Sequence, residues 1–274
     1  MTDTADLASG KGHHDENFPV ASFLLRPEHR APVMAYYRFA RAADDIADNE
    51  QATQATKLDL LARMRAGLDR DGPPEAVALG AVMAARGIDP IHAHDLLDAF
   101  VRDVTEARCA DWDDLIGYCR LSAMPVGRFV LDVHGESRET WPANDALCAA
   151  LQVINHLQDC GKDYRTLGRV YIPLDTGIDL ADLARARATP ALRAIITALV
   201  ERTRDLLDRS AGFSAMIRDR RLAAEVAAIH RLAVSLCDRL ATRDPLSERV
   251  HHGKLEAALL GLSAAVPALL RRAA

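Results

Sequence analysis

Residues 37–48 read YRFARAADDIAD, and this stretch indicates both the fold and a candidate site. Alanine is its most frequent residue and is the strongest helix former. At 100° per residue, a face of that helix only about 60° wide carries Tyr37, Arg41, Asp44 and Asp48. The stretch therefore predicts a helix with a polar stripe made of a phenol, a guanidinium and two carboxylates.

A second stretch, LQVINHLQDCGKD at residues 151–163, has the same character. Within about 80° of one helix face it places Gln152, Asn155, Asp159 and Asp163. Apolar residues border this stripe, as expected for the lining of a cavity. Mg²⁺ in proteins commonly binds a few carboxylates together with substrate phosphates. If the two stripes face each other, they form a set of hard oxygen ligands suited to that ion.

A single Asp-x-x-x-Asp pair is weak evidence for a metal site. A third pair, Asp175 and Asp179, straddles Gly177 after a proline and is expected to lie in a loop. For either stripe alone, a solvated face with i,i+4 charge pairs is the simplest alternative. The polar neighbours of the first two pairs favour a site over that alternative.

Composition favours an all-α protein. The chain has 274 residues, of which 49% are hydrophobic and 5% aromatic, and alanine and leucine are abundant while strand patterns are scarce. The formal net charge of −5 argues against a nucleic-acid partner, which usually requires a basic surface. Five scattered cysteines suit a reducing, cytoplasmic environment.

The pattern of helix starts and breaks predicts one domain of roughly ten helices over residues 13–274, after a disordered tail at residues 1–12. We find no linker long enough to separate domains. An extended stretch is expected at about 168–173. The expected helices span about 27–48, 57–68, 89–108, 111–134, 144–165 and 189–216, with two or three more towards the C-terminus.

The longest uncharged apolar stretch, residues 257–270, is too short to span a bilayer. We expect it to be a buried last helix; the alternative is an amphipathic helix that contacts the inner face of the membrane. The polar N-terminus does not resemble a signal peptide. The sequence does not indicate an oligomeric state.

Three motifs in order resemble the squalene/phytoene synthase family. Residues 37–48 resemble its first aspartate motif, and residues 152–173, from Gln152 through Asp163-Tyr164 to GRVYIP, resemble its second. Between them, Tyr118-Cys119-Arg120 through Val126-Gly127 matches the central tyrosine motif. The resemblance extends from about His14 to the C-terminus.

The resemblance implies an all-α isoprenoid synthase bundle around a central cavity, in which Mg²⁺ bridges the aspartate motifs to a diphosphate. Tyr37 and Tyr118 would line the reaction centre, and Gln152 would line the same polar stripe. The neighbouring Tyr36 points about 100° away from Tyr37 and is expected to pack. The implied metal ligands are Asp44, Asp48, Asn155, Asp159 and Asp163, and the implied diphosphate contacts are His14, Arg41, Arg249 and Lys254.

Three departures from the common family pattern resemble the hydroxysqualene synthase branch of bacterial hopanoid biosynthesis. They are Asn17-Phe18, the run Ser122-Ala123-Met124-Pro125, and Gln158 in place of arginine. That branch ionises presqualene diphosphate, rearranges the cation and lets water capture it, without NADPH. It is thus a carbon–oxygen lyase. Ser122 and Gln158 are candidate water-holding residues near the cation.

Two alternatives stay open from the sequence. One is a head-to-head prenyltransferase that makes presqualene diphosphate, squalene or phytoene. The other, of a different class, is a non-catalytic assembly or binding protein with the same fold, which we would expect to have lost metal ligands.

Overall fold

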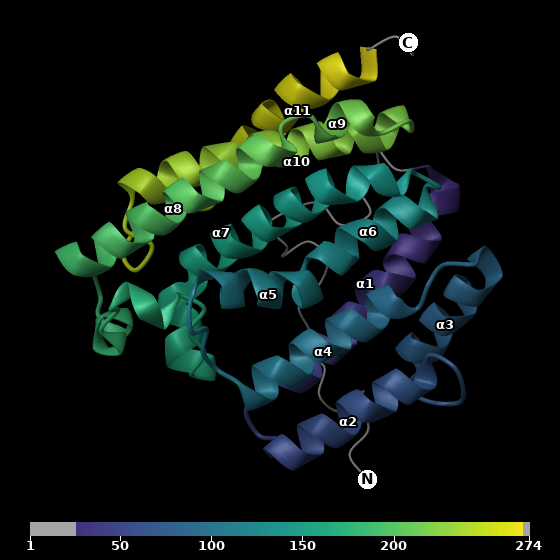
Figure 1. Ribbon diagram of the computed structural model, residues 1–274, viewed down its shortest axis with the longest axis horizontal. Helices are drawn as coiled ribbons and strands as arrows, with labels where there is room; N and C mark the ends of the chain where they lie inside the picture. Colours follow the sequence, from purple (N-terminus) through teal and green to yellow (C-terminus); the bar gives the residue numbers. More distant parts are fainter. Residues whose placement is uncertain (1–25, 271–274) are drawn as a thin grey trace. The chain divides into compact units, whose positions relative to one another are not determined.

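The computed structural model describes residues 26–270, and within this range every regular element is a helix (Figure 1). Extended backbone pairs there at an isolated parallel bridge between Arg108 and Val170. The predicted all-α fold is therefore confirmed. The predicted tail, residues 1–12, lies outside the described residues, and the single domain over residues 13–274 stays a prediction.

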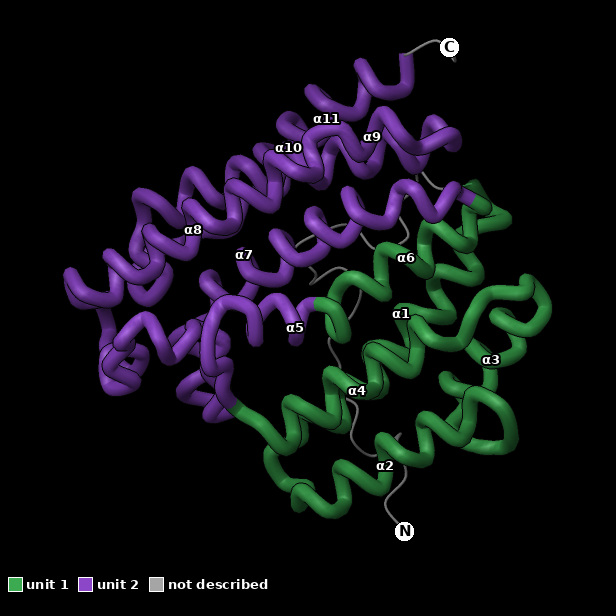
Figure 2. Tube along the Cα trace, viewed as in Figure 1, with its two compact units in different colours: residues 1–107, 120–135 green, residues 108–119, 136–274 purple. Residues whose placement is uncertain are grey.

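The chain divides into two compact units, drawn in two colours in Figure 2. The first comprises residues 1–107 and 120–135, and the second comprises residues 108–119 and 136–274. Helix α5 (Trp112–Ser122) contains the point at which the chain passes from the second unit back to the first.

Helix α1 is the centre of the first unit, because it contacts each of the other four helices there. It spans Pro27–Asp48, as the sequence predicts, and it begins with a proline at the first helical position, where no backbone N–H is needed. The other helices of this unit are α2 (Gln54–Gly67), α3 (Pro74–Arg86), α4 (Ile91–Thr105) and α6 (Met124–Val133).

One face of α1 forms the core of this unit. Tyr36, Phe39, Ala43 and Ile46 recur at helical spacing and are all buried. The ring of Tyr36 stacks on that of Phe129 with 4.3 Å between centroids, and its hydroxyl donates to the backbone oxygen of His92 at 2.8 Å. Tyr36 is therefore the packing tyrosine of the Tyr36-Tyr37 pair, as expected.

The second unit is built around α10, which packs against each of the four other α-helices that follow residue 140. Figure 1 shows α8, α10 and α11 running side by side. Short 3-10 turns connect and flank these helices: η2 (Arg138–Thr140), η3 (Leu174–Thr176) and η4 (Leu180–Ala184). The α-helices are α7 (Trp141–Leu167), α8 (Pro190–Ser210), α9 (Phe213–Met216), α10 (Arg220–Thr242) and α11 (Lys254–Leu270).

Two predicted helix boundaries are wrong for reasons that involve proline. The helix expected over residues 111–134 is divided at Ala123, because Pro125 fits the first turn of a new helix, α6, better than the interior of α5. Conversely, Trp141-Pro142 is the start of α7 rather than a break, with proline in the first turn. Helix α7 consequently has 27 residues.

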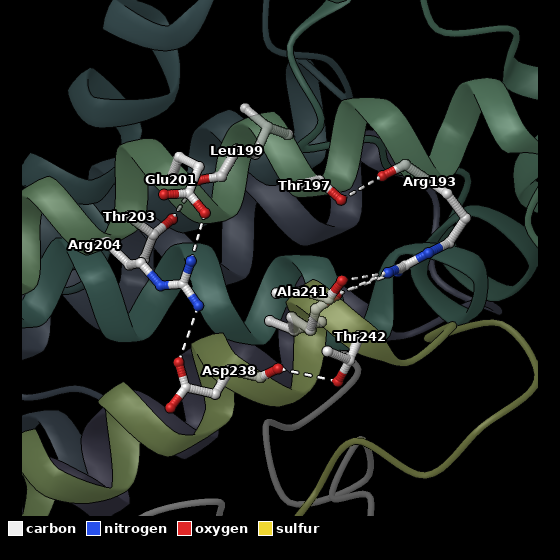
Figure 3. A network of polar contacts seen from close by, with 10 residues as sticks. Arg193, Thr197, Leu199, Glu201, Thr203, Arg204, Asp238, Ala241 and Thr242 are labelled. Carbon is white, nitrogen blue, oxygen red and sulfur yellow. Dashed lines mark hydrogen bonds and ion pairs between the residues drawn. The ribbon is translucent and has the colours of Figure 1, made fainter.

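Charged side chains attach α8 to α10 within the second unit (Figure 3). The guanidinium of Arg193 donates to the backbone oxygens of Leu240 and Ala241 at 3.0 to 3.2 Å, so a cation lies at the C-terminal end of α10, where it is favoured. Arg204 bonds to both Glu201 and Asp238, at 2.9 Å in the latter case. These contacts fix the register of the two helices.

The last helix, α11, is not buried as expected. Its small residues Gly261, Ala265 and Ala268 are buried, and the two alanines pack in a cluster with Ala224 of α10. The large apolar side chains of α11 are exposed, namely those of Leu255, Leu259, Leu262, Val266 and Leu270. No helix within residues 26–270 is long and apolar enough to cross a membrane. Contact of α11 with a membrane surface stays a prediction.

Candidate functional site

The polar stripe on α1 lies at the edge of the first unit's core. Each of its members is neither fully buried nor fully exposed, as expected for the lining of a site. Arg41 is held firmly, since its two terminal nitrogens donate to Asp44 at 2.8 Å and to Asp45 at 2.9 Å. The stripe therefore presents a pre-formed cluster of charges, in which Asp48 is the second carboxylate of the predicted pair.

Asp45 was not predicted as a site residue. Its side chain is 11% exposed and it anchors the guanidinium of Arg41 one helical turn away. The i,i+4 spacing of an arginine and an aspartate was the signal that could have identified it. Arg41 divides its single positive charge between Asp44 and Asp45. Asp44 is therefore only partly neutralised and can still bind another cation.

The C-terminal end of α1 receives a further positive charge from α2. The ammonium of Lys57 donates to the backbone oxygen of Ala47 at 2.9 Å, next in sequence to Asp48. Cations are favoured at helix C-termini, where backbone oxygens lack partners. Sequence analysis missed Lys57 because only the fold brings α2 back to the end of α1.

The second stripe lies on α7 in the second unit, and Gln152, Asn155, Asp159 and Asp163 are all partly buried there. The Asp159 carboxylate is 3.9 Å from the ammonium of Lys162. Lys162 is exposed and Asp159 is only partly buried, so this ion pair contributes little to stability and leaves the carboxylate available.

Helix α7 is seated tightly on the side away from this stripe. A Cβ atom added at Gly161 would lie 2.4 Å from Cδ2 of Leu246 and 3.3 Å from the backbone oxygen of Leu183. Arg165 donates to the same oxygen at 3.2 Å, so its guanidinium is directed towards η4. Because Gly161 has no side chain, α7 can pack closely against Leu246 and Leu183. This close packing fixes the position of the stripe on the other side of the helix.

The backbone after α7 brings an aromatic residue to Tyr118. Gly168 ends the helix with φ 66°, in the left-handed conformation that glycine adopts without strain. Of the extended stretch expected over residues 168–173, Val170 forms a bridge with Arg108, and its backbone oxygen accepts from the N–H of Cys109 at 3.3 Å. This contact places Tyr171 with its ring centroid 5.1 Å from that of Tyr118.

His156 completes a three-ring cluster with these tyrosines. Its imidazole stacks on Tyr171 with 3.6 Å between centroids and an interplanar angle of 18°, and it lies 5.7 Å from the ring of Tyr118. The Nε2 atom of His156 is 3.1 Å from Nε2 of Gln152, so the predicted stripe residue orients the ring. We refer to Tyr118, His156 and Tyr171 as the aromatic cluster.

The imidazole of His156 is held neutral. Burial, and then the positive charge of Arg169, lower its pKa from 6.5 to about 3. Neither His156 nor Tyr171 was predicted as a site residue, although both stand within the second motif. His156 could have been identified in the sequence as a polar residue directly beside the stripe. Nothing in the sequence alone indicates that its ring stacks on Tyr171.

The two candidate water-holding residues share an unusual feature. Among the described residues, neither amide atom of buried Gln158 has a hydrogen-bond partner, and the same is true of the buried hydroxyl oxygen of Ser122. Leaving such groups unpaired is costly, so they are normally satisfied by protein, water or ligand. Each belongs to a different unit, and each is suited to bind a water molecule or a polar ligand atom.

The remaining predicted contacts are less informative. Arg249 is exposed in the segment before α11, where its guanidinium donates to the backbone oxygen of His252 at 3.4 Å. Lys254 is exposed at the first position of α11. Their diphosphate roles stay predictions. His14 and Asn17 lie outside the described residues.

Within residues 26–270, no three carboxylate, histidine or cysteine side chains converge on a common metal position. The donors on each stripe are nonetheless carboxylate and amide oxygens, the type that Mg²⁺ prefers.

The third aspartate pair differs from the two stripes. Asp175 is exposed in η3, and Asp179 accepts from the backbone N–H of Ala181 at 3.0 Å as the cap of η4. The loop expected for this pair is thus a segment of short 3-10 turns, with Asp175 inside η3 and Asp179 directly before η4.

Comparison with known proteins agrees with these motifs. The family model for squalene/phytoene synthase matches residues 11–256. Hydroxysqualene synthase from Zymomonas mobilis is 55% identical over 267 residues, covering 94% of this chain and 89% of that protein. Hydroxysqualene synthase from Rhodopseudomonas palustris is 51% identical, covering 99% of this chain and 95% of that protein.

Solved structures agree in fold. The crystal structure of squalene synthase HpnC from Alicyclobacillus acidocaldarius has a TM-score of 0.69 at 31% identity, covering 86% of this chain and 90% of that one. A dehydrosqualene synthase in complex with ligand has a TM-score of 0.75 at 21% identity, covering 97% and 96% of the two chains, and this second likeness concerns the fold alone.

Proposed function

The chain belongs to the squalene/phytoene synthase family, and we propose that it is a hydroxysqualene synthase that converts presqualene diphosphate and water to hydroxysqualene and diphosphate. The observation that carries this proposal is the high identity, over nearly the whole chain, to relatives of that name. The two half-buried aspartate stripes and the aromatic cluster supply groups that this chemistry requires.

The first step breaks the carbon–oxygen bond, and the bonding electrons leave with diphosphate. Asp44, Asp48, Asn155, Asp159 and Asp163 would hold Mg²⁺, which supplies the positive charge that makes diphosphate a better leaving group. Arg41 also offers a guanidinium suited to phosphate oxygens. Asp45 pre-orients that guanidinium, so less conformational freedom is lost when an anion binds.

The aromatic cluster suits the cation that remains after ionisation. The faces of aromatic rings attract cations, most strongly where water is excluded. An imidazolium at His156 would repel the same cation, so the neutral ring that burial favours suits this step. Gln152 keeps the neutral ring in its place.

The last step adds water to the rearranged cation: the water oxygen forms the new carbon–oxygen bond and a proton is released. Gln158 and Ser122 have buried polar atoms without partners among the described residues, so either can bind that water without giving up an existing hydrogen bond. Replacing them should therefore change the product before it abolishes ionisation.

The test is to incubate purified protein with presqualene diphosphate and Mg²⁺ in the absence of NADPH. We expect hydroxysqualene, and we expect chelation or Asp159→Asn to reduce its formation by several orders of magnitude. Asp175→Asn is the matched control, because it removes an aspartate from an equally spaced pair that lies on an exposed turn. Consumption of presqualene diphosphate without an alcohol product would refute the proposal.

A second candidate is a squalene synthase activity, the one for which the similar Alicyclobacillus protein is named. It would start from farnesyl diphosphate and would need a reductant to deliver hydride to the final cation. Supplying farnesyl diphosphate with and without NADPH distinguishes it, because only this candidate predicts squalene that depends on NADPH.

A further inference from the structure

The end of α1 that carries the candidate metal ligands has an unfavourable charge distribution. Three of the last five residues of this helix are aspartates: Asp44, Asp45 and Asp48. The C-terminal end of a helix carries a partial negative charge, so carboxylates there destabilise the last turn. Asp48 is moreover the final helical residue, at a position where helices commonly fray. The last turn of α1 therefore needs support from another element if the Asp48 carboxylate is to keep a fixed position.

Two common ways of stabilising a helix end are missing from this end of α1. Asn49 follows the helix in an extended conformation, with φ −63° and ψ 112°, instead of a glycine in the left-handed conformation. Residues 45–48 include no basic side chain. The last carbonyl oxygens of α1 are thus left to water or to donors from elsewhere. The ammonium of Lys57, in the first turn of α2, is such a donor, because it binds the backbone oxygen of Ala47 at 2.9 Å.

The loop between α1 and α2 is built so that Lys57 returns to this position. The side-chain oxygen of Asn49 accepts from the backbone N–H groups of Gln51 and Ala52, both at 2.9 Å. Thr53 then caps α2, and its hydroxyl accepts from the N–H of Thr56 at 3.2 Å. An asparagine turn followed directly by a helix cap fixes the path of a short loop. The contact between Lys57 and the end of α1 is therefore set by the fold of the loop.

We propose that Lys57 is a positioning residue, which stabilises the last turn of α1 and so holds the carboxylate of Asp48 ready for a metal ion. Its ammonium supplies the positive charge that this helix end lacks, and it does so at the backbone. The functional part of this inference rests on the proposed function, in which Asp48 is a metal ligand. The structural part can be measured on protein without metal or substrate.

Two other roles for Lys57 would have different consequences. A lysine that only added positive charge near the site would repel Mg²⁺, so its removal would lower the Mg²⁺ concentration that turnover requires. A lysine that contacted the diphosphate would, when removed, lower kcat even at saturating Mg²⁺. Removal of a positioning lysine should instead raise the Mg²⁺ requirement, although a positive charge is lost. It should leave kcat nearly unchanged at excess Mg²⁺, because bound metal itself then stabilises the turn.

Hydrogen exchange of the metal-free, full-length protein tests the structural part. In Lys57→Met, which removes the ammonium, peptides covering residues 45–49 should exchange on the order of tenfold faster than in the wild type. Lys57→Arg keeps a charged donor and should restore protection. The matched control is Gln54→Ala, because Gln54 lies in the same turn of α2 but donates to the backbone oxygen of Val104 of α4 at 3.2 Å. It should leave α1 unchanged.

Turnover of presqualene diphosphate at increasing Mg²⁺ concentrations tests the functional part. Lys57→Met should need roughly three- to tenfold more Mg²⁺ for half-maximal turnover, with kcat within about twofold of the wild type at saturation. Lys57→Arg and Gln54→Ala should behave like the wild type.

The proposal is overturned if Lys57→Met exchanges like the wild type, or if Gln54→Ala accelerates exchange at the end of α1 equally. A lower Mg²⁺ requirement in Lys57→Met would show a merely repulsive charge, and a lower kcat at saturating Mg²⁺ would show a diphosphate contact; either result also overturns it. No turnover by the wild type would refute the proposed function instead. The exchange comparison would then still decide whether Lys57 holds the end of α1.

Discussion

The neutrality of His156 can be tested through the pH dependence of stability. Its pKa is about 3 in the folded protein and 6.5 ordinarily, so between these values the unfolded chain binds more protons than the folded one. Stability contributed by the neutral ring is therefore present above pH 6.5 and is lost as pH falls towards 3. Between pH 7 and pH 5 this single group should lower the free energy of unfolding by about 2 kcal/mol.

Many carboxylates titrate over the same range, so the informative quantity is the difference between wild type and variant. His156→Gln and His156→Leu both remove the titrating group. At pH 7 each loses the stack on Tyr171 and the contact with Gln152, at a cost of about 1 to 3 kcal/mol. At pH 5 that gap should shrink by about 2 kcal/mol for both variants, whatever its size at pH 7.

Urea unfolding of metal-free protein at the two pH values measures this gap. The two variants control for each other, because they differ in polarity but share the loss of the imidazole. A gap that stays constant within about 0.5 kcal/mol from pH 7 to pH 5 would refute the reasoning, since it would mean that His156 titrates alike in the folded and unfolded chains.

Three further predictions concern packing and reactivity. Gly161→Ala should lower the free energy of unfolding by about 1 to 3 kcal/mol, because the new methyl group would clash with its neighbours. Gly117→Ala is the control and should not lower it, because no atom lies near the new methyl group. Thermal melts compare the two variants. Glu136→Ala should cost about 2 to 4 kcal/mol in urea unfolding, because the carboxylate accepts from two backbone N–H groups just before α10, at 3.0 and 2.8 Å; an unchanged midpoint would contradict this. A thiol reagent should label Cys148 first in the native protein, since the other four cysteines are buried, and mass spectrometry of digests identifies the site.

The fold class could be predicted from the sequence because helix signals are local. Pro27 and the 3.6-residue pattern after it gave the bounds of α1, and the absence of strand patterns excluded a sheet. The errors at residues 123 and 141 arose because proline can end one helix or begin the next. Which of these occurs depends on packing partners that are distant in sequence.

The candidate site was predictable in part. The stripes on α1 and α7 follow from spacing alone, and their half-buried positions agree with it. Lys57, Asp45 and Tyr171 were missed because their importance depends on contacts. Lys57 meets the end of α1 only through the turn between helices, and Tyr171 meets His156 only because the chain after Gly168 pairs with Cys109.

Helix α7 carries negatively charged side chains and uncharged polar side chains at neighbouring positions. Its stripe concentrates negative charge at Asp159 and Asp163, which a bound Mg²⁺ would balance. His156 and Gln158, which lie between Asn155 and Asp159 in the sequence, are polar, buried and uncharged. An arginine at position 158 would add a positive charge to this buried region and would require a partner. A neutral amide needs no charged partner, and its two polar atoms, unpaired among the described residues, are able to bind water.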